Sequence, residues 1–210
     1  TTSDATSHQI YDRLLDFDPE SGRIVPSLAS SWNISDDGLI YTFQLRKNVQ
    51  FQSTSYFTPT RNFNADDVLF SINRWRQASH PYHNVSGGRY PYFESLGLAE
   101  NIASLKRING YRIEIHLAQR DSSFLANLAT DFSVVLSQEY ADYLMDQGTP
   151  EKLDHFPIGT GPFEFESYRK DHFIRYLRND DYWRDTSQAE RLIYDITPKS
   201  SLRLAKLLTG

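Results

Sequence analysis

The sequence predicts a mixed α/β (α+β) fold in which sheets of paired strands alternate with helices. Three observations lead to this prediction. Side chains alternate between two environments from Ile40 to Arg46, which is the two-residue period of a half-buried strand. A sharply capped helix start follows at Asn64. The dipeptide Asn109-Gly110, set between two runs of β-forming residues, is the strongest short hairpin signal in the chain.

The first forty residues predict one helix and one hairpin. Apolar residues at helical spacing indicate a short helix over residues 6–15. Residues 18–22, with one proline and one glycine, are typical of a turn. A strand is expected from Ser30 to Ser35, and Asp36-Asp-Gly38 then returns the chain into the strand that begins at Ile40.

The next segment contains a short strand and the capped helix. Val49 and Phe51 predict a second, shorter strand. Asn64 can cap a helix by accepting a backbone N–H, and Asp66 and Asp67 place negative charge in its first turn. Spacings of three and four then give this helix one apolar face, made of Ala65, Val68, Ile72 and Trp75.

Residues 102–117 form a hairpin in this prediction, and two helices follow. The first helix begins at Ser122 or Ser123 and ends at Thr130. Ser137 caps the second, and Gly148 suits the left-handed position after its C-terminus.

The last fifty residues predict three strands and a helix. The strands cover residues 163–168, 172–179 and 192–197, and we expect the first two to pair antiparallel. Ser200 is expected to cap a final helix that has leucines on one face.

Composition excludes some classes of function. The net charge is −5 and the pI is about 5.7, which argues against a general nucleic-acid binder, because phosphate binding needs a concentrated basic surface. No apolar run approaches the roughly 18 residues that a membrane span needs. Cysteine is absent, which is compatible with any redox compartment.

Candidate chemical groups point to binding rather than catalysis. His80 and His83 have a spacing found in metal sites, but suitable further ligands are not nearby, so we expect no bound metal. Adjacent aspartates occur at Asp66-Asp67 and at Asp180-Asp181, where helix-start electrostatics and a turn explain them better than acid–base catalysis. Gly159-Thr160-Gly161 is a glycine-rich bend that lacks the lysine of a phosphate loop.

Two further functional hypotheses stay open at this point. The first is a surface module that binds polyanions through a basic patch, made of Arg74, Arg76, Arg89, Lys106 and Arg107. The second is a hydrolase, although no set of nucleophile, base and orienting residue is visible.

Several segments together resemble the family 5 extracellular solute-binding proteins, the peptide-, nickel- and haem-binding proteins of ABC importers. The family signature resembles residues 41–46, Phe51 and residues 64–71. Within the family, further segments are most similar to the dipeptide-binding and SapA branch: Tyr11–Leu14, Phe57–Arg61, His83–Ser86, Tyr92-Phe93, Glu139–Ala141, Lys152–Asp154 and Pro157–Pro162. Residues 206–210 favour SapA over the dipeptide protein.

The resemblance implies a fold like the type II periplasmic binding proteins with an extra subdomain. It places residues 1–27 and 156–210 in one lobe and residues 28–155 in an inserted subdomain. It also implies that a second large lobe, absent from this sequence, completes the protein. The residues that anchor the ends of a ligand would belong to that second lobe.

The resemblance also implies a function. We expect a periplasmic, monomeric protein without enzymatic activity or cofactor, which captures peptides (with antimicrobial peptides and haem as alternative cargo) and delivers them to an inner-membrane ABC permease. The ligand-binding residues implied are Thr1, Thr2, Ser3 and Asp4 at the N-terminus, Gly159, Thr160 and Gly161 in the bend, and Tyr90 and Tyr92 in the subdomain.

Overall fold

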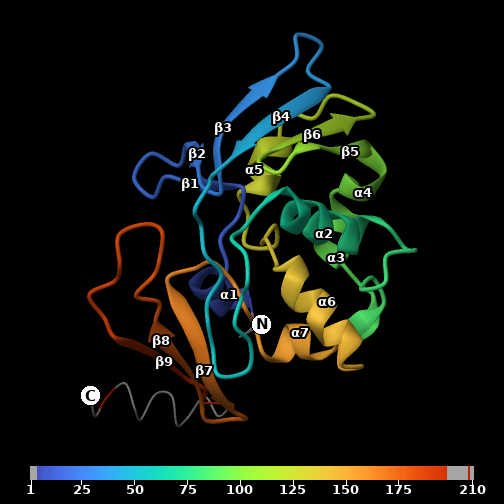
Figure 1. Ribbon diagram of the computed structural model, residues 1–210. Coiled ribbons are helices and arrows are strands. Elements are labelled where there is room, and N and C mark those ends of the chain that lie inside the picture. Colours follow the sequence, from blue (N-terminus) through green and yellow to red (C-terminus); the bar gives the residue numbers. More distant parts are fainter. Residues whose placement is uncertain (1–3, 198–207, 209–210) are drawn as a thin grey trace.

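A computed structural model describes residues 4–197 and Leu208, and the mixed α/β fold predicted from the sequence is confirmed there. In Figure 1 a four-stranded sheet lies at the top, helices lie beneath it, and a smaller sheet lies at the lower left. The segment between β4 and α2 runs from the large sheet towards the small one and back, so it lies between the two parts (Figure 1).

The large sheet has the strand order β3-β4-β6-β5 and is antiparallel throughout. Its strands are β3 (Ala29–Ile34), β4 (Ile40–Leu45), β5 (Ile102–Asn109) and β6 (Arg112–Leu117). Both predicted hairpins are confirmed. Gly38 adopts a φ of 70° in the β3–β4 turn, and the β5–β6 turn follows Asn109, whose side chain accepts a hydrogen bond from the N–H of Tyr111.

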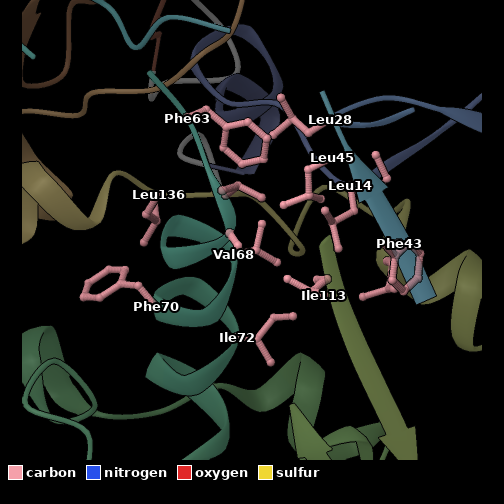
Figure 2. Close-up of a cluster of buried hydrophobic side chains, with 14 of the residues drawn as sticks. Leu14, Leu28, Phe43, Leu45, Phe63, Val68, Phe70, Ile72, Ile113 and Leu136 are labelled. Carbon is pink, nitrogen blue, oxygen red and sulfur yellow. The ribbon is translucent and has the colours of Figure 1, made fainter. Parts of the chain in front are cut away.

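Helix α2 (Ala65–Arg76) covers one face of this sheet, and its predicted cap is confirmed. Asn64 accepts a hydrogen bond from the N–H of Asp66, while Asp67 accepts one from the N–H of Asn64, which completes a capping box. Figure 2 shows Val68 and Ile72 between the helix backbone and the strands of the sheet. The apolar stripe predicted from the sequence therefore forms the centre of the larger core.

Shorter helices complete the layer around α2. They are α3 (Pro91–Ser95), α4 (Leu98–Asn101), α5 (Phe124–Leu128), α6 (Gln138–Asp146) and α7 (Lys152–His155), with a 3-10 turn, η1, at Val85–Gly87. Ser137 caps α6 by accepting a hydrogen bond from the N–H of Tyr140, as predicted. Across the described helices, none is both long and apolar enough to cross a bilayer.

The small sheet follows the bend at residues 159–161. It comprises β7 (Phe163–Arg169), β8 (Phe173–Arg178) and β9 (Arg191–Asp195) in that order. The predicted antiparallel pairing of its first two strands is confirmed. Ile174 and Tyr176 of β8 pack with Phe163 and with Ile10 of helix α1 (Asp4–Ile10), forming an apolar cluster distinct from the larger core.

The helix predicted over residues 6–15 is too long at its C-terminal end. It stops at Ile10, and the following residues enter β1 (Leu15–Phe17), which pairs with β2 (Ile24–Pro26). The carbonyl of Leu14 accepts a hydrogen bond from the N–H of Ala29, so pairing with a later segment replaces the helical bond that local periodicity favoured.

The short strand predicted at Val49 and Phe51 is wrong. Both side chains are buried, but their segment joins no sheet of the described residues. The carbonyl of Val49 instead accepts a single hydrogen bond from the N–H of Phe63, so a strand-like pattern was produced by burial alone. The helix predicted from Ser200 falls outside the described residues.

Asp67 joins α2 to α6 and is fully buried. Its carboxylate forms a bidentate pair with Arg61, at 2.7 and 2.8 Å, and accepts the N–H of Gln138 at 2.9 Å. Together with the N–H of Asn64, these donors occupy both oxygens. This hydrogen bonding raises the pKa of Arg61 further above its ordinary value. The pair therefore fixes where the N-terminus of α6 meets α2.

We expect Asp67→Ala to lower the free energy of unfolding by about 3–5 kcal/mol, because it leaves a partly buried guanidinium and two backbone N–H groups without their acceptor. Asp66→Ala is the matched control, since its ion pair with Arg107 is solvent-exposed and its loss costs about 1 kcal/mol or less. Urea denaturation of both variants gives the two values. Equal losses would contradict the special role of Asp67.

Candidate functional site

The bend at residues 159–161 lies against the C-terminal end of α1, and only glycine fits at positions 159 and 161. The N–H of Gly161 donates to the carbonyl of Ile10 at 2.8 Å. A side chain at Gly159 would overlap that same carbonyl, and a Cβ at Gly161 would lie 2.6 Å from the carbonyl carbon of Ile10. The two glycines therefore allow two backbone segments to touch.

The side chain of Gln52 forms hydrogen bonds with both segments of this contact. Gln52 is 2% exposed, and the two hydrogens of its Nε2 are shared among the carbonyls of Ile10, Gly161 and Phe163, at 3.2, 3.1 and 2.7 Å. Its Oε1 accepts the N–H of Gly159 at 3.1 Å, and its own backbone N–H donates to the carbonyl of Gly159. One carboxamide thus satisfies polar backbone groups at the end of α1, in the bend and at the start of β7.

Asp12 ties the same region to the segment after β8. Its carboxylate accepts hydrogen bonds from Thr160 Oγ1 at 2.9 Å, from Trp183 Nε1 at 2.7 Å and from Tyr182 Oη at 3.1 Å. Asp12 is 6% exposed, and burial raises its pKa above the ordinary value, an effect that these donors partly oppose. Asn179 adds a hydrogen bond to the carbonyl of Gly161.

Of the predicted N-terminal and bend residues, the structure describes Asp4 and residues 159–161. Thr1, Thr2 and Ser3 lie outside the described residues, and Asp4 begins α1. Gly159–Gly161 are buried, and the backbone hydrogen bonds described above are made within the protein. The geometry favours a role for the bend in positioning α1, and its direct contact with a ligand stays a prediction.

Tyr90 and Tyr92 are not brought to the bend. They lie at the start of α3, beside α2 and away from α1 and β7 in Figure 1. Tyr90 donates to the carbonyl of His83 at 3.0 Å, and Tyr92 stacks on Phe132 with ring centroids 3.5 Å apart. These contacts give both rings a packing role, and ligand contact by them stays a prediction.

The two histidines of the loop after α2 each have a partner within the fold. His80 accepts the N–H of Tyr82 and meets Phe70 edge to face, and burial lowers its pKa below the ordinary value. His83 Nδ1 lies 2.8 Å from the carbonyl of Arg74. In the part of the chain that the structure describes, no group of three or more His, Cys, Asp or Glu side chains is arranged to hold a metal ion.

The basic residues proposed as a polyanion patch are partly neutralised. Arg74 pairs with Asp154 at 2.9 Å, and Arg107 pairs with Asp66 at 2.8 Å. Arg76 donates to the carbonyl of Ile102. Three of the five proposed cations are therefore paired with a carboxylate or bonded to the backbone, which weakens the polyanion hypothesis.

Aromatic side chains line one surface pocket of about 250 Å³ that the sequence did not predict. It is formed by Tyr56, Tyr140, Tyr143, Phe156 and neighbouring residues of α6 and α7. Sequence reasoning also missed Gln52, Asp12 and Trp183. A signal was available for Gln52, since it directly follows the apolar Phe51, but its partners in the bend and in β7 lie more than one hundred residues away.

We expect Gly159→Ala to destabilise the protein by roughly 3 kcal/mol, because the added methyl group overlaps the carbonyl of Ile10 and forces α1 from the bend. Gly110→Ala is the control. Its nearest neighbour would be a flexible arginine tip 3.9 Å away, so we expect a change below about 1 kcal/mol. Thermal and urea unfolding measure both variants, and a tolerated Gly159→Ala would refute the close-contact argument.

Asp12 should make stability depend on pH in a defined direction. Because its pKa is raised in the folded protein, the folded state takes up a proton before the unfolded state as the pH falls. Stability contributed by Asp12 therefore increases as the pH falls from above its folded pKa towards the ordinary value of 3.8.

Asp12→Asn removes this titration. We expect the difference in unfolding free energy, wild type minus Asp12→Asn, to become more favourable to the wild type as the pH falls from neutral towards 3.8, the ordinary value of the carboxyl. Urea denaturation at three pH values measures the difference. A difference that is constant or moves the other way would contradict the assignment.

Comparisons of the sequence and of the structure with known proteins identify the same family. Residues 23–210 match the model of the bacterial extracellular solute-binding proteins, family 5 Middle. Over 99% of its length the chain is 48% identical to the dipeptide-binding protein of Escherichia coli. It is 48% identical to heme-binding protein A of Haemophilus influenzae over 100% of its length, and 45% identical to the probable periplasmic-binding protein SapA of Escherichia coli over 99%.

The chain spans about two fifths of the length of these curated relatives, 39%, 38% and 38% respectively. Its fold matches the crystal structure of a dipeptide-binding protein from Pseudoalteromonas in complex with Met-Leu. The TM-score is 0.94 at 46% identity, over 99% of this chain and 41% of that chain. The chain therefore belongs to the bacterial extracellular solute-binding proteins of family 5.

Proposed function

We propose that this chain is part of the periplasmic solute-binding component of an ABC importer, which captures peptides and passes them to an inner-membrane permease. The observation that carries the proposal is the fold match, over nearly the whole chain, to a binding protein in complex with a dipeptide. Membership of a solute-binding family also supports binding over catalysis, so we propose no enzymatic activity and no cofactor.

Peptide is the proposed cargo, and haem is the second candidate. Both cargoes have support, because a dipeptide-binding protein and a heme-binding protein are equally similar to this chain, at 48% identity each. Identities of 45–48% do not separate these two branches from SapA, so the SapA assignment and its antimicrobial peptides stay predictions.

The proposed binding region is the N-terminal side of α1 and the bend that holds its other end. Thr1, Thr2, Ser3 and Asp4 would offer backbone groups and small hydroxyls, which suit the main chain of a peptide without selecting its side chains. Residues 159–161 support this region by fixing the end of α1 through Ile10 and Gln52. Tyr90 and Tyr92 are weaker candidates, because they lie away from α1 (Figure 1).

The contacts among the described residues support a division into one lobe and one subdomain. We infer that residues 1–27 and 156–210 form one lobe and residues 28–155 a subdomain. The apolar cluster of Ile10, Phe163, Ile174 and Tyr176 supports this, as do the hydrogen bonds from Asp12 to Tyr182 and Trp183. Leu14 and Leu15 pack in the larger core, so the proposed lobe and subdomain share an interface there.

A second lobe is proposed to close over the cargo in a full-length protein that contains this sequence. Closure of two lobes buries most of a small ligand and removes water from its polar contacts. If two charged hydrogen bonds to the cargo come from the other lobe, at roughly 1.5–3 kcal/mol each, their loss weakens binding by about 10² to 10⁴.

The full-length protein and residues 1–210 alone should therefore differ in affinity. Isothermal titration of the full-length protein with Met-Leu and, separately, with haem identifies the cargo class. We expect saturable binding of at least one, and binding at least about a hundredfold weaker by residues 1–210. Failure of the full-length protein to bind either Met-Leu or haem would overturn the proposed function, and equal affinities would place the site entirely within this sequence.

A further inference from the structure

A surface pocket of about 500 Å³ lies between the end of β4 and the segment that carries Trp183. It is lined by Ser30, Gln44, Leu45, Arg46, Lys47, Asn48, Val49 and Trp183. The proposed cargo residues do not line it, within the part of the chain that the structure describes. Two cations and several hydrogen-bonding groups thus meet at a place that the cargo proposal does not use.

Arg46 is held in place in a way that leaves part of its guanidinium open. Its Nε donates to the carbonyl of Ser27 at 2.6 Å, and its guanidinium lies 4.9 Å from the centre of the Trp183 ring. Its two terminal nitrogens have no acceptor among residues 4–197. A guanidinium fixed through Nε and an aromatic face has lost much of its side-chain freedom, so it binds an anion at a smaller entropic cost.

Lys47 and Asn48 add donors beside it. Lys47 is exposed, and its ammonium group lies 5.5 Å from the centre of the Tyr111 ring. Asn48 adopts a left-handed φ of 61°, and within the described residues the backbone N–H groups of Lys47 and Asn48 have no acceptor. Turns of this kind, with free N–H groups, are typical of concavities that bind anions.

The charges of this pocket are not balanced by the protein. Arg74 and Arg107 of the proposed basic patch pair with aspartates, but no carboxylate among the described residues forms an ion pair with Arg46 or Lys47. Nearby Arg184, which also lies over Trp183 at 4.5 Å, is matched by Asp16. Arg46 and Lys47 therefore place two positive charges without an ion-pair partner at this pocket, in a protein whose net charge is −5.

We propose that this pocket binds a phosphate monoester group. Such a group carries about −1.5 to −2 charges at neutral pH and three acceptor oxygens, which matches two cations and adjacent N–H donors better than a singly charged carboxylate does. The group can belong to a soluble ester or to a phospholipid headgroup, and both present the same chemistry.

The test uses the full-length protein, free of cargo, at low ionic strength. Glycerol 3-phosphate is titrated by calorimetry as the soluble probe. Vesicles of phosphatidylcholine with phosphatidic acid, compared with phosphatidylcholine alone, are the lipid probe in a flotation assay. We expect saturable binding of the soluble probe that weakens as salt screens the charges.

Three variants locate the site. Lys47→Gln removes an exposed charge and leaves the packing of the pocket intact, so we expect binding about tenfold to a hundredfold weaker. Arg46→Gln is expected to act similarly, but it also removes a contact with Trp183, so Lys47→Gln alone decides. Lys106→Gln, which removes the same charge from β5 at the opposite edge of the large sheet, is the control and should bind like the wild type.

Each outcome has a consequence. Binding of glycerol 3-phosphate that is weakened by Lys47→Gln and unchanged by Lys106→Gln supports the site and a soluble source. Binding of phosphatidic acid vesicles alone, with the same response to the variants, supports the site and a lipid source. Absence of saturable binding to both probes, or equal affinities for Lys47→Gln and Lys106→Gln, overturns the proposal. The cargo titrations are independent of all these results.

Discussion

The hydrogen bonds of one buried carboxamide hold the two parts of this molecule together. The backbone groups at the end of α1, in the glycine bend and at the start of β7 all turn inward, where water does not reach them, and each needs a partner. Gln52 supplies donors and an acceptor to all of them at once. Without such a group the buried N–H of Gly159 would lose its side-chain acceptor, and the carbonyls of Ile10 and Gly161 would each lose one of their donors.

Much of the fold was predictable because it depends on neighbouring residues. The cap at Asn64, the turn at Gly38 and the hairpin after Asn109 each satisfy their own backbone within a few positions, so the local sequence contains the whole cause. The error over residues 6–15 shows the limit of that reasoning. Helical spacing of leucines was present, but distant backbone groups competed for the same carbonyls.

The candidate site was less predictable for the same physical reason. The glycine-rich bend was visible in the sequence, and the structure shows that Gly159 and Gly161 allow the backbone of Ile10 to approach it. The polar residues that stabilise this contact gave no such signal, because a buried glutamine or aspartate is indistinguishable in sequence from an exposed one. Asp66 and Asp67 illustrate this directly, since adjacent identical residues have opposite burial and different partners.

The link between Asp12 and Trp183 has a consequence for how the chain folds during synthesis. The two residues are 171 positions apart, so α1 leaves the ribosome long before its last anchoring partner is made. Contacts of such long range form late, because the entropy of closing the loop between them must first be overcome. Until Thr160, Tyr182 and Trp183 have emerged, the Asp12 carboxylate lacks the hydrogen-bond donors that it has in the folded protein. The region proposed to meet cargo is therefore among the last to reach its final structure.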